Sequence, residues 1–381
     1  MTERLFDKDS KLCSFNAEVI SCNLIDGKYE ILLNRTAFFP NEGGQTSDVG
    51  ALGNVTVENV IERNGKIFHV CDSPLAVGST VHGEIDFSHR YYNMQNHTGE
   101  HIISGIVHNK YGYENVGFHL SREGMTVDFS GELTREQLDE IEDLANRVIY
   151  ECRPIKCYYP TDDELDSISY RSKLESLENT RLVIIDGVDI CACCAPHVYN
   201  TGEVGIIKIL DFIRYKGGVR LNVVCGMAAL HDYREKYNQC KLISNALSVK
   251  QNDVFDATQR LLDTIDGYRA KLYLAKRELR TYKLASIKET DGNICIFEDD
   301  ADVNDARELV NSAMEKCGGI CACFVGNDSD GYKYIAASSA VNMKEIAARM
   351  KEELSSRGGG SEKMIQGSTP ATRENIEKFF K

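Results

Sequence analysis

The stretch HTGEH at residues 97–101 places two histidines, His97 and His101, four positions apart. Four positions are about one turn of an α-helix, so both imidazoles can project from one face. The same helical spacing continues on both sides of the pair, at Arg90, Met94 and Gly105. We therefore predict that the pair lies on a helix, in an arrangement that can hold a metal ion.

A second pair of potential ligands occurs almost a hundred residues later, in CCAPH at residues 193–197. Cys193 and His197 are again four positions apart, and together with the first pair they supply three imidazoles and one thiolate. This set suits a tetrahedral zinc ion. A competing interpretation is that HxxEH is the inverted zinc-peptidase pattern, in which Glu100 would be the general base and the cysteine incidental.

The composition describes an ordinary globular chain of 381 residues with 14 cysteines and no run of about 18 apolar residues. The amino terminus lacks the pattern of a signal peptide, so we expect a cytoplasmic protein whose thiols stay free or bind metal. Neighbouring cysteines such as Cys191 and Cys194 more often alternate across a strand than bind a second metal. We therefore predict Cys193 alone as the sulfur ligand.

The net charge of −14 argues against indiscriminate binding to nucleic acid. Local clusters of positive charge nevertheless occur in two stretches, at Arg269, Lys271, Lys276, Arg277, Arg280, Lys283 and Lys288, and at Lys208, Arg214, Lys216 and Arg220. A solvated helix face explains such runs as well as an RNA-binding surface does. Charge alone leaves both interpretations open.

The order of the expected elements predicts an α+β protein, beginning with a small β-barrel over residues 1–88. Asp26-Gly27 and Asn64-Gly65 are expected to form hairpin turns there. Residues 89–231 are expected to form a mixed α+β domain with strands at 116–120, 125–129, 181–185, 201–212 and 219–225. Its second helix should start after Thr134, with Gln137 completing a capping box, and end near Cys152.

The second half of the chain is expected to contain a helical arm over 232–289 and a small α/β domain over 290–381. The arm carries a heptad seam and should break near residues 249–252. The last domain is expected to have strands at 293–297, 319–325 and 332–338 and helices at 306–316 and 343–354. Its glycine run at 358–360, beside Arg357 and Lys363, would suit either a phosphate site or a flexible loop.

Three segments together match the pattern of a known family. They are Thr36–Gln45, which ends in Gly43-Gly44-Gln45, Arg90–His101, and Cys193–Val198 followed by Thr201–Gly205. In order, spacing and flanking residues they resemble the AlaX-type alanyl-tRNA editing proteins, which are free-standing relatives of the editing half of alanyl-tRNA synthetase. The remainder resembles the helical arm and the DHHA1-type carboxyl-terminal domain of the long form. Two departures are Phe39 in place of tyrosine and Ala195-Pro196 in place of Gly-Thr.

The resemblance implies a zinc-dependent hydrolase that deacylates tRNA(Ala) mischarged with serine, with glycine as a further candidate, and that does not itself charge tRNA. It implies His97, His101, Cys193 and His197 as zinc ligands. Thr36 would bind the serine hydroxyl, and Gly43, Gly44 and Gln45 would bind water or the carbonyl. Glu100 is a candidate for proton transfer. Four protein ligands would close a tetrahedral site, so either His197 binds loosely or the zinc only positions the substrate.

The resemblance also implies contact between tRNA and the second half of the chain, for which the candidate residues are Arg269, Lys276, Arg277, Arg280, Lys283, Arg357 and Lys363. A homodimer through the arm or the carboxyl-terminal domain is a further expectation. Two other functions stay open at this point. One is a zinc metallopeptidase of the HxxEH type, and the other is a non-catalytic tRNA-binding protein with a structural zinc.

Overall fold

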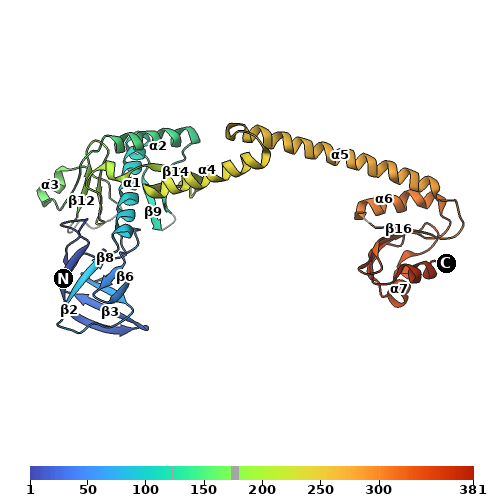
Figure 1. The fold of residues 1–381 in the computed structure, drawn as a ribbon, viewed down its shortest axis with the longest axis horizontal. Helices are drawn as coiled ribbons and strands as arrows, with labels where there is room; N and C mark the ends of the chain where they lie inside the picture. The colour runs from blue at the N-terminus through green and yellow to red at the C-terminus, as the bar shows by residue number, and fades with distance from the viewer. Residues whose placement is uncertain (122–123, 173–179, 300) are drawn as a thin grey trace. The chain divides into compact units, whose positions relative to one another are not determined.

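The computed structural model describes residues 1–121, 124–172, 180–299 and 301–381. The chain divides into two compact units, Met1–Leu242 and Ile243–Lys381, both of which mix helices and strands (Figure 1). The predicted α+β class is therefore confirmed. The finer division into four domains stays a prediction. None of the helices in the described ranges combines the length and the hydrophobicity that a membrane span requires.

A closed six-stranded barrel, blue in Figure 1, forms the first part of unit 1, as the sequence predicted. In barrel order its strands are β2 (Ser14–Ile25), β3 (Lys28–Leu33), β7 (Lys66–Cys71), β6 (Val55–Arg63), β5 (Gly50–Leu52) and β8 (Thr80–Ile85). Both predicted hairpin turns are present, with φ of 49° and 80° at Asp26-Gly27 and of 53° and 71° at Asn64-Gly65. Two successive left-handed residues match the twist of the flanking strands.

Helix α1 (Phe87–Tyr111) is the central element of unit 1. Asp86 caps its start by accepting hydrogen bonds from the N–H groups of Ser88 and His89, and Gly112 ends it in a left-handed conformation. Residues 96–105 are buried on every face of the helix. Gly99 allows this burial, because a Cβ there would lie 2.4 Å from Cys225 Sγ.

The elements around α1 include a four-stranded sheet in the order β14-β15-β10-β9 and a three-stranded sheet in the order β11-β12-β13. Their bounds are β9 Asn115–Ser121, β10 Gly124–Phe129, β14 Ile207–Tyr215, β15 Gly218–Cys225, β11 Ile155–Tyr158, β12 Leu182–Ile185 and β13 Asp189–Ala192; the helices are α2 (Arg135–Tyr150) and α3 (Asp162–Ser167). The predicted capping box of α2 is present between Thr134 and Gln137. Side chains from α1, α2 and the four-stranded sheet form one apolar core.

The strand predicted over residues 201–212 was wrong in its first half. Thr201–Val204 forms a 3-10 helix, η1, and β14 begins only at Ile207. The Thr201 hydroxyl donates to the carbonyl of Val148, and Gly205 has a φ of 85°. These contacts turn the chain away from an extended path before the strand starts.

Two helices connect the barrel-containing part of the chain to the carboxyl-terminal sheet: α4 (Met227–Leu247) and α5 (Val254–Ser286). The 3-10 turn η2 (Gln251–Asp253) separates them, which confirms the predicted break. Ser248 has a φ of 54°, and the Ser244 hydroxyl donates to the carbonyl of Val249. A left-handed residue ends the first helix here.

The carboxyl-terminal sheet has five strands in the order β16-β17-β18-β20-β19. Its elements are β16 Ile294–Glu298, α6 Val303–Ala313, η3 Met314–Lys316, β17 Cys321–Asn327, β18 Gly331–Ala337, α7 Met343–Glu353, β19 Arg357–Gly360, β20 Met364–Thr369 and α8 Arg373–Phe379. The glycine run is thus an edge strand, so the flexible-loop interpretation was wrong. Gly358 allows this pairing, because a Cβ there would lie 2.2 Å from the carbonyl oxygen of Gln366.

Candidate metal centre

Four side chains from two remote segments meet at one point beside α1. One nitrogen or sulfur atom from each of His97, His101, Cys193 and His197 lies within 4.8 Å of the others. Helix α1 supplies the first two, and the turn after β13 supplies the other pair. The three histidines are buried and Cys193 is half-buried. The meeting of these segments, which the sequence predicted, is confirmed.

Each of the three imidazoles is held at its Nδ1 atom by a different partner. The three Nδ1 contacts are His97 to Gln45 Oε1 at 2.9 Å, His101 to Asp189 Oδ2 at 2.8 Å, and His197 to Thr98 Oγ1 at 3.0 Å. Amide and carboxylate oxygens only accept, so His97 and His101 carry their proton on Nδ1. Nε2 is then the atom of each of these two rings that can bind a metal.

The spacing of the ligand atoms fits zinc. Cys193 Sγ lies 3.5 Å from His97 Nε2 and 3.4 Å from His197 Nε2. A tetrahedral zinc ion with usual Zn–S and Zn–N bond lengths separates sulfur from nitrogen by about 3.6 Å. Cys193, His97 and His197 therefore need almost no movement to share one ion.

The electrostatics at the cluster favour the ligand forms of Cys193 and His197. Burial opposes ionisation of Cys193, but its contacts with the imidazoles of His97 and His197 favour the thiolate and hold the pKa of its thiol well below the ordinary range. Burial lowers the pKa of His197 to about 3, so this imidazole is neutral. Burial also disfavours a charged His101, but Glu100 and Asp189 hold its pKa well above the usual value, so a metal ion must displace the Nε2 proton to bind there. A cation is thus favoured at this position.

The cysteines next to Cys193 have different environments. Burial and the nearby Cys193 raise the pKa of the Cys194 thiol, which keeps Cys194 protonated. Cys191 belongs to a second group of possible ligands, with His101 and Asp189. Both oxygens of Asp189 are already paired with the guanidinium of Arg171. These contacts favour Cys193 as the sulfur ligand.

The glycine-rich loop packs directly against the cluster. Gly44 has a φ of 80°, and a Cβ there would lie 2.5 Å from the carbonyl oxygen of Phe118, whose ring lies 4.7 Å from that of His97. Gln45 is 3% exposed. Its Oε1 faces His97, and its Nε2 has no hydrogen-bond partner within the described residues. An unpartnered amide donor therefore lies beside the proposed ligands.

A buried ion pair fixes this loop to α1. Arg90 and Asp48 are both fully buried and bonded to each other, and Arg90 also donates to the carbonyls of Ser10 at 2.7 Å and Ala37 at 2.6 Å. Asp48 accepts a bond from the Phe39 N–H. Sequence reasoning placed Arg90 on the helical stripe but missed Asp48 as its partner. An Asp in the loop and an Arg on the helix were the available signal.

Glu100 lies close to the cluster. Its Oε1 accepts hydrogen bonds from the Ser104 hydroxyl at 2.6 Å and from the Asn115 amide, and its Oε2 lies 3.9 Å from His101 Nε2. The carboxylate is buried and fixed in position. Its role in proton transfer stays a prediction.

Thr36 lies in the barrel core, and its hydroxyl bonds to His69 rather than to a member of the cluster. Thr36 Oγ1 lies 2.8 Å from His69 Nε2 and accepts from the Phe38 N–H at 3.1 Å. Burial lowers the pKa of His69 to about 4, and its Nδ1 faces the Ile31 carbonyl. A neutral His69 with its proton on Nδ1 must accept the Thr36 proton. Sequence reasoning missed His69, for which an inward position in β7 was the one available signal.

Three of the predicted tRNA-binding residues form ion pairs with carboxylates of α6 and β16 in the carboxyl-terminal unit, and Arg269 pairs with Asp266 of its own helix at 3.2 Å. Arg280 bonds to Asp305 and Glu308, and Lys283 lies 2.6 Å from Glu298. Lys276 lies 3.9 Å from the Asp305 carboxylate. The remaining four are exposed, namely Arg269, Arg277, Arg357 and Lys363. The structure thus brings the first group to α6 and β16 and leaves the second group at the surface.

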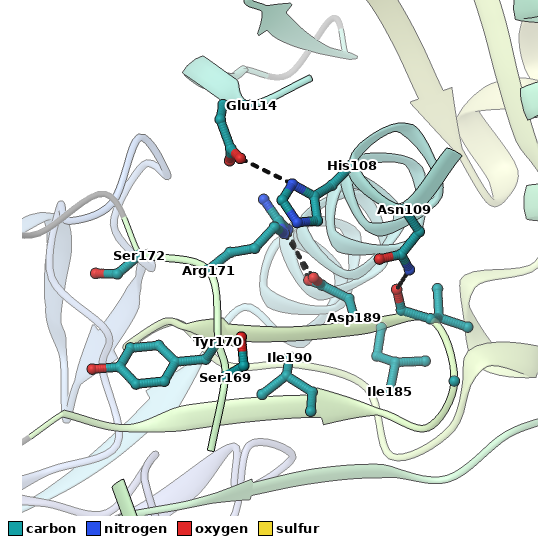
Figure 2. Close-up of a pocket in the computed structure, with 12 residues that line it drawn as sticks. His108, Asn109, Glu114, Ser169, Tyr170, Arg171, Ser172, Ile185, Asp189 and Ile190 are labelled. Atoms are coloured by element: carbon teal, nitrogen blue, oxygen red, sulfur yellow. Dashed lines mark hydrogen bonds and ion pairs between the residues drawn. The ribbon is translucent and has the colours of Figure 1, made fainter. Parts of the chain in front are cut away.

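A pocket of about 620 Å³ adjoins the residues that support the cluster (Figure 2). The end of α1, residues 169–172 and the β12–β13 hairpin line it. Figure 2 shows Arg171 reaching Asp189 across this pocket, and His108 paired with Glu114 at 2.9 Å. Because Asp189 also contacts His101, the pocket wall and the cluster share one carboxylate.

The sequence is similar to a family of tRNA synthetase domains and to alanyl-tRNA editing proteins. The family described as "Threonyl and Alanyl tRNA synthetase second additional domain" matches residues 180–222, which include Cys193 and His197. The alanyl-tRNA editing protein AlaX-L of Pyrococcus horikoshii is 27% identical, with 99% of this chain and 96% of that protein covered. Alanyl-tRNA editing protein Aarsd1-A of Xenopus laevis is 25% identical, with 94% and 92% covered.

Longer proteins match as well. The alanine-tRNA ligase of Methanococcus vannielii is 29% identical, and this chain spans 43% of its length. Among solved structures, the C-Ala domain of Aquifex aeolicus alanyl-tRNA synthetase covers 25% of this chain at 16% identity and a TM-score of 0.22, which carries no inference about fold. By sequence, the chain is therefore a homologue, over nearly its full length, of the AlaX-type alanyl-tRNA editing proteins and of the corresponding part of alanine-tRNA ligases.

Proposed function

We propose that this chain hydrolyses the ester of tRNA(Ala) mischarged with serine, with glycine as a second candidate amino acid. The observation that carries the proposal is the cluster of His97, His101, Cys193 and His197 in a chain that matches a named editing protein from end to end. A zinc ion in this cluster would supply Lewis-acid chemistry and fix the substrate carbonyl. Since an aminoacyl ester is already activated, the remaining chemistry is modest.

The residues around the cluster would orient and stabilise the reacting groups. The unpartnered Gln45 Nε2 can donate to the ester carbonyl as negative charge develops on its oxygen. Glu100 can accept the proton of the attacking water. Four protein ligands make a closed zinc site, which supports a positioning role unless one ligand leaves. His197 is the candidate for leaving, because its Nδ1 partner is the neutral Thr98 hydroxyl.

Selectivity for serine would come from Thr36. Its proton is donated to the neutral His69 and its oxygen accepts from the Phe38 N–H, so one lone pair is left to accept a hydrogen bond from a serine hydroxyl. A buried polar group positioned for such a hydrogen bond is left unpaired by an analogue that lacks the hydroxyl, so the site discriminates against that analogue. Alanyl-tRNA would then be spared.

The deciding experiment follows the deacylation of seryl-tRNA(Ala) and alanyl-tRNA(Ala). We expect wild type to release serine, His101→Ala to be inactive, and Thr36→Val to lose its preference for serine. Thr56→Val, on an exposed position of a barrel strand, is the matched control and should behave as wild type. A wild-type protein that leaves both esters intact would refute the editing function.

Two further measurements, of peptide hydrolysis and of tRNA retention on a filter, separate the two alternative functions. A zinc peptidase would lose its activity in Glu100→Gln and keep it in Cys193→Ser. A non-catalytic protein would retain tRNA on a filter and release no serine. We expect neither outcome, because Cys193 lies with the three histidines and the unpartnered Gln45 amide lies beside them.

Binding to the body of the tRNA is proposed for the exposed basic residues Arg269, Arg277, Arg357 and Lys363. Neutralising them should weaken binding and reduce its dependence on salt.

A homodimer is proposed through the apolar seam on α5, whose large side chains are exposed at Leu261, Ile265, Tyr268, Leu272, Leu279 and Tyr282. Leu272→Lys should then convert a dimer to a monomer in light scattering, and a monomeric wild type would refute the proposal.

A further inference from the structure

Asp189 connects the metal-ligand cluster to Arg171. Its Oδ2 accepts the Nδ1–H of His101 at 2.8 Å. Arg171 grips the same carboxylate in a bidentate pair, with Nε to Oδ1 and Nη2 to Oδ2 both at 2.8 Å. The side chains are 2% and 10% exposed. Water therefore has little access to either contact.

We propose that Asp189 and Arg171 are positioning residues of the metal centre, which set the orientation and the donor strength of His101. The proposal rests on the zinc site proposed above. At the three Nδ1 atoms of the cluster, Asp189 is the charged partner, because His97 contacts an amide there and His197 a hydroxyl. A carboxylate at Nδ1 keeps the proton there and strengthens Nε2 as a donor.

Arg171 fixes the carboxylate in turn. A bidentate pair sets the plane of the Asp189 carboxylate, and it compensates a charge that would be costly to bury alone. The backbone of Arg171 also runs beside β13, with its N–H bonded to the Ile190 carbonyl at 2.8 Å and its carbonyl bonded to the Ala192 N–H at 2.9 Å. Residue 171 therefore stabilises the strand that begins at Asp189 and leads directly into Cys193.

The alternation of side chains along β13 explains how this one short strand positions both Asp189 and Cys193. Positions 189 and 191 of β13 point to the same buried face, and Cys193 follows immediately after the strand. Asp189 and Cys193 thus approach His101 from one segment. A shift of this strand would move a ligand and the support of another ligand together.

The same geometry predicts the number of metal ions. Cys191, Asp189 and His101 also lie close enough to share a cation. The guanidinium of Arg171 is already bonded to both oxygens of Asp189 and neutralises the carboxylate there. We therefore expect one zinc per chain.

The test measures zinc affinity by competition with a chromophoric chelator, on full-length protein. We expect Asp189→Asn to weaken zinc binding about 10- to 100-fold. Arg171→Lys, which keeps the positive charge and loses the bidentate contact with Asp189, should weaken zinc binding less than Asp189→Asn does. Asp128→Asn is the matched control, because Arg220 holds Asp128 in an equally bidentate pair at 2.6 and 2.7 Å on β10 and β15. Its affinity should stay within about threefold of wild type.

Cobalt substitution adds a signature that a loss of folding would not give. In Asp189→Asn the thiolate-to-cobalt absorption from Cys193 should persist, while the ligand-field bands shift because His101 has changed. If Asp189→Asn does not fold, Arg171→Lys decides on the same two measurements. An affinity within threefold of wild type and an unchanged cobalt spectrum would overturn the inference.

The outcomes also separate this inference from the proposed function. A wild-type chain that binds no zinc would refute the metal centre itself. A wild type that binds one zinc and deacylates seryl-tRNA, together with an Asp189→Asn variant of equal affinity, would refute only the positioning role. Two zinc ions per wild-type chain would contradict the role given to Arg171.

Discussion

Gly44→Ala tests how closely the glycine-rich loop must approach the metal centre. Gly44 has a φ of 80°, and the added Cβ would lie 2.5 Å from the Phe118 carbonyl oxygen and 2.9 Å from Phe118 Cδ1. Gly27→Ala is a matched control, since Gly27 also has a φ of 80° and its added Cβ would meet nothing within 4 Å. The two substitutions share the backbone cost and differ in the steric clash.

The expected magnitudes follow from that difference. A left-handed backbone costs an alanine about 1 kcal/mol relative to glycine at either position. At Gly44 the Cβ is too close to a carbonyl oxygen, so the loop or β9 must shift, and such overpacking adds about 1–3 kcal/mol. Gly44→Ala should therefore lower the free energy of unfolding by about 2–4 kcal/mol, and Gly27→Ala by about 1 kcal/mol.

The shift should also reach the proposed ligands. The Phe118 ring packs on His97, and Gln45, the next residue in the loop, accepts the His97 Nδ1–H. Zinc affinity should therefore fall in Gly44→Ala and not in Gly27→Ala. Urea unfolding followed by circular dichroism gives the first quantity, and chelator competition gives the second. Equal unfolding free energies for the two variants, within 0.5 kcal/mol, would refute the reasoning, because the clash would then cost nothing.

Three further predictions concern other parts of the chain. Cys193→Ser should lose the bound zinc in a metal assay, whereas Cys194→Ser should keep it, because the raised pKa of Cys194 leaves a protonated thiol there. His69 has a folded pKa of about 4 against 6.5 unfolded, so the unfolded state binds more protons between these values and stability falls as the pH drops. Urea unfolding at pH 7 and pH 5 should show a loss about 2 kcal/mol smaller in His69→Gln than in wild type, and equal losses would contradict a buried neutral histidine. Arg280→Ala should lower the melting temperature of the carboxyl-terminal unit, since Arg280 pairs with two carboxylates of α6. Arg277→Ala, at an exposed position, should weaken tRNA binding without changing the melting temperature. The reverse pattern would contradict these assignments.

The sequence revealed the elements whose signals are local. Asn64-Gly65 predicted a hairpin turn because a two-residue turn needs positive φ at both positions, and Asn and Gly adopt it readily. The Thr134 capping box predicted the start of α2 because its partners lie three residues apart. The strand expected over 201–212 failed because a side-chain bond from Thr201 to a distant carbonyl overrode the local preference. The flexible-loop interpretation of the glycine run at 358–360 was wrong because strand pairing with β20 is a long-range contact.

The sequence by itself indicated which four side chains meet in the cluster, because the spacing of His97 and His101 and of Cys193 and His197 is a property of the chain. Only the tertiary structure decided how these residues are supported. Asp189, Arg171 and His69 carry no spacing signal, since each acts on a partner far away in sequence. Their roles depend on burial and on which atoms face each other, and packing alone brings those atoms together.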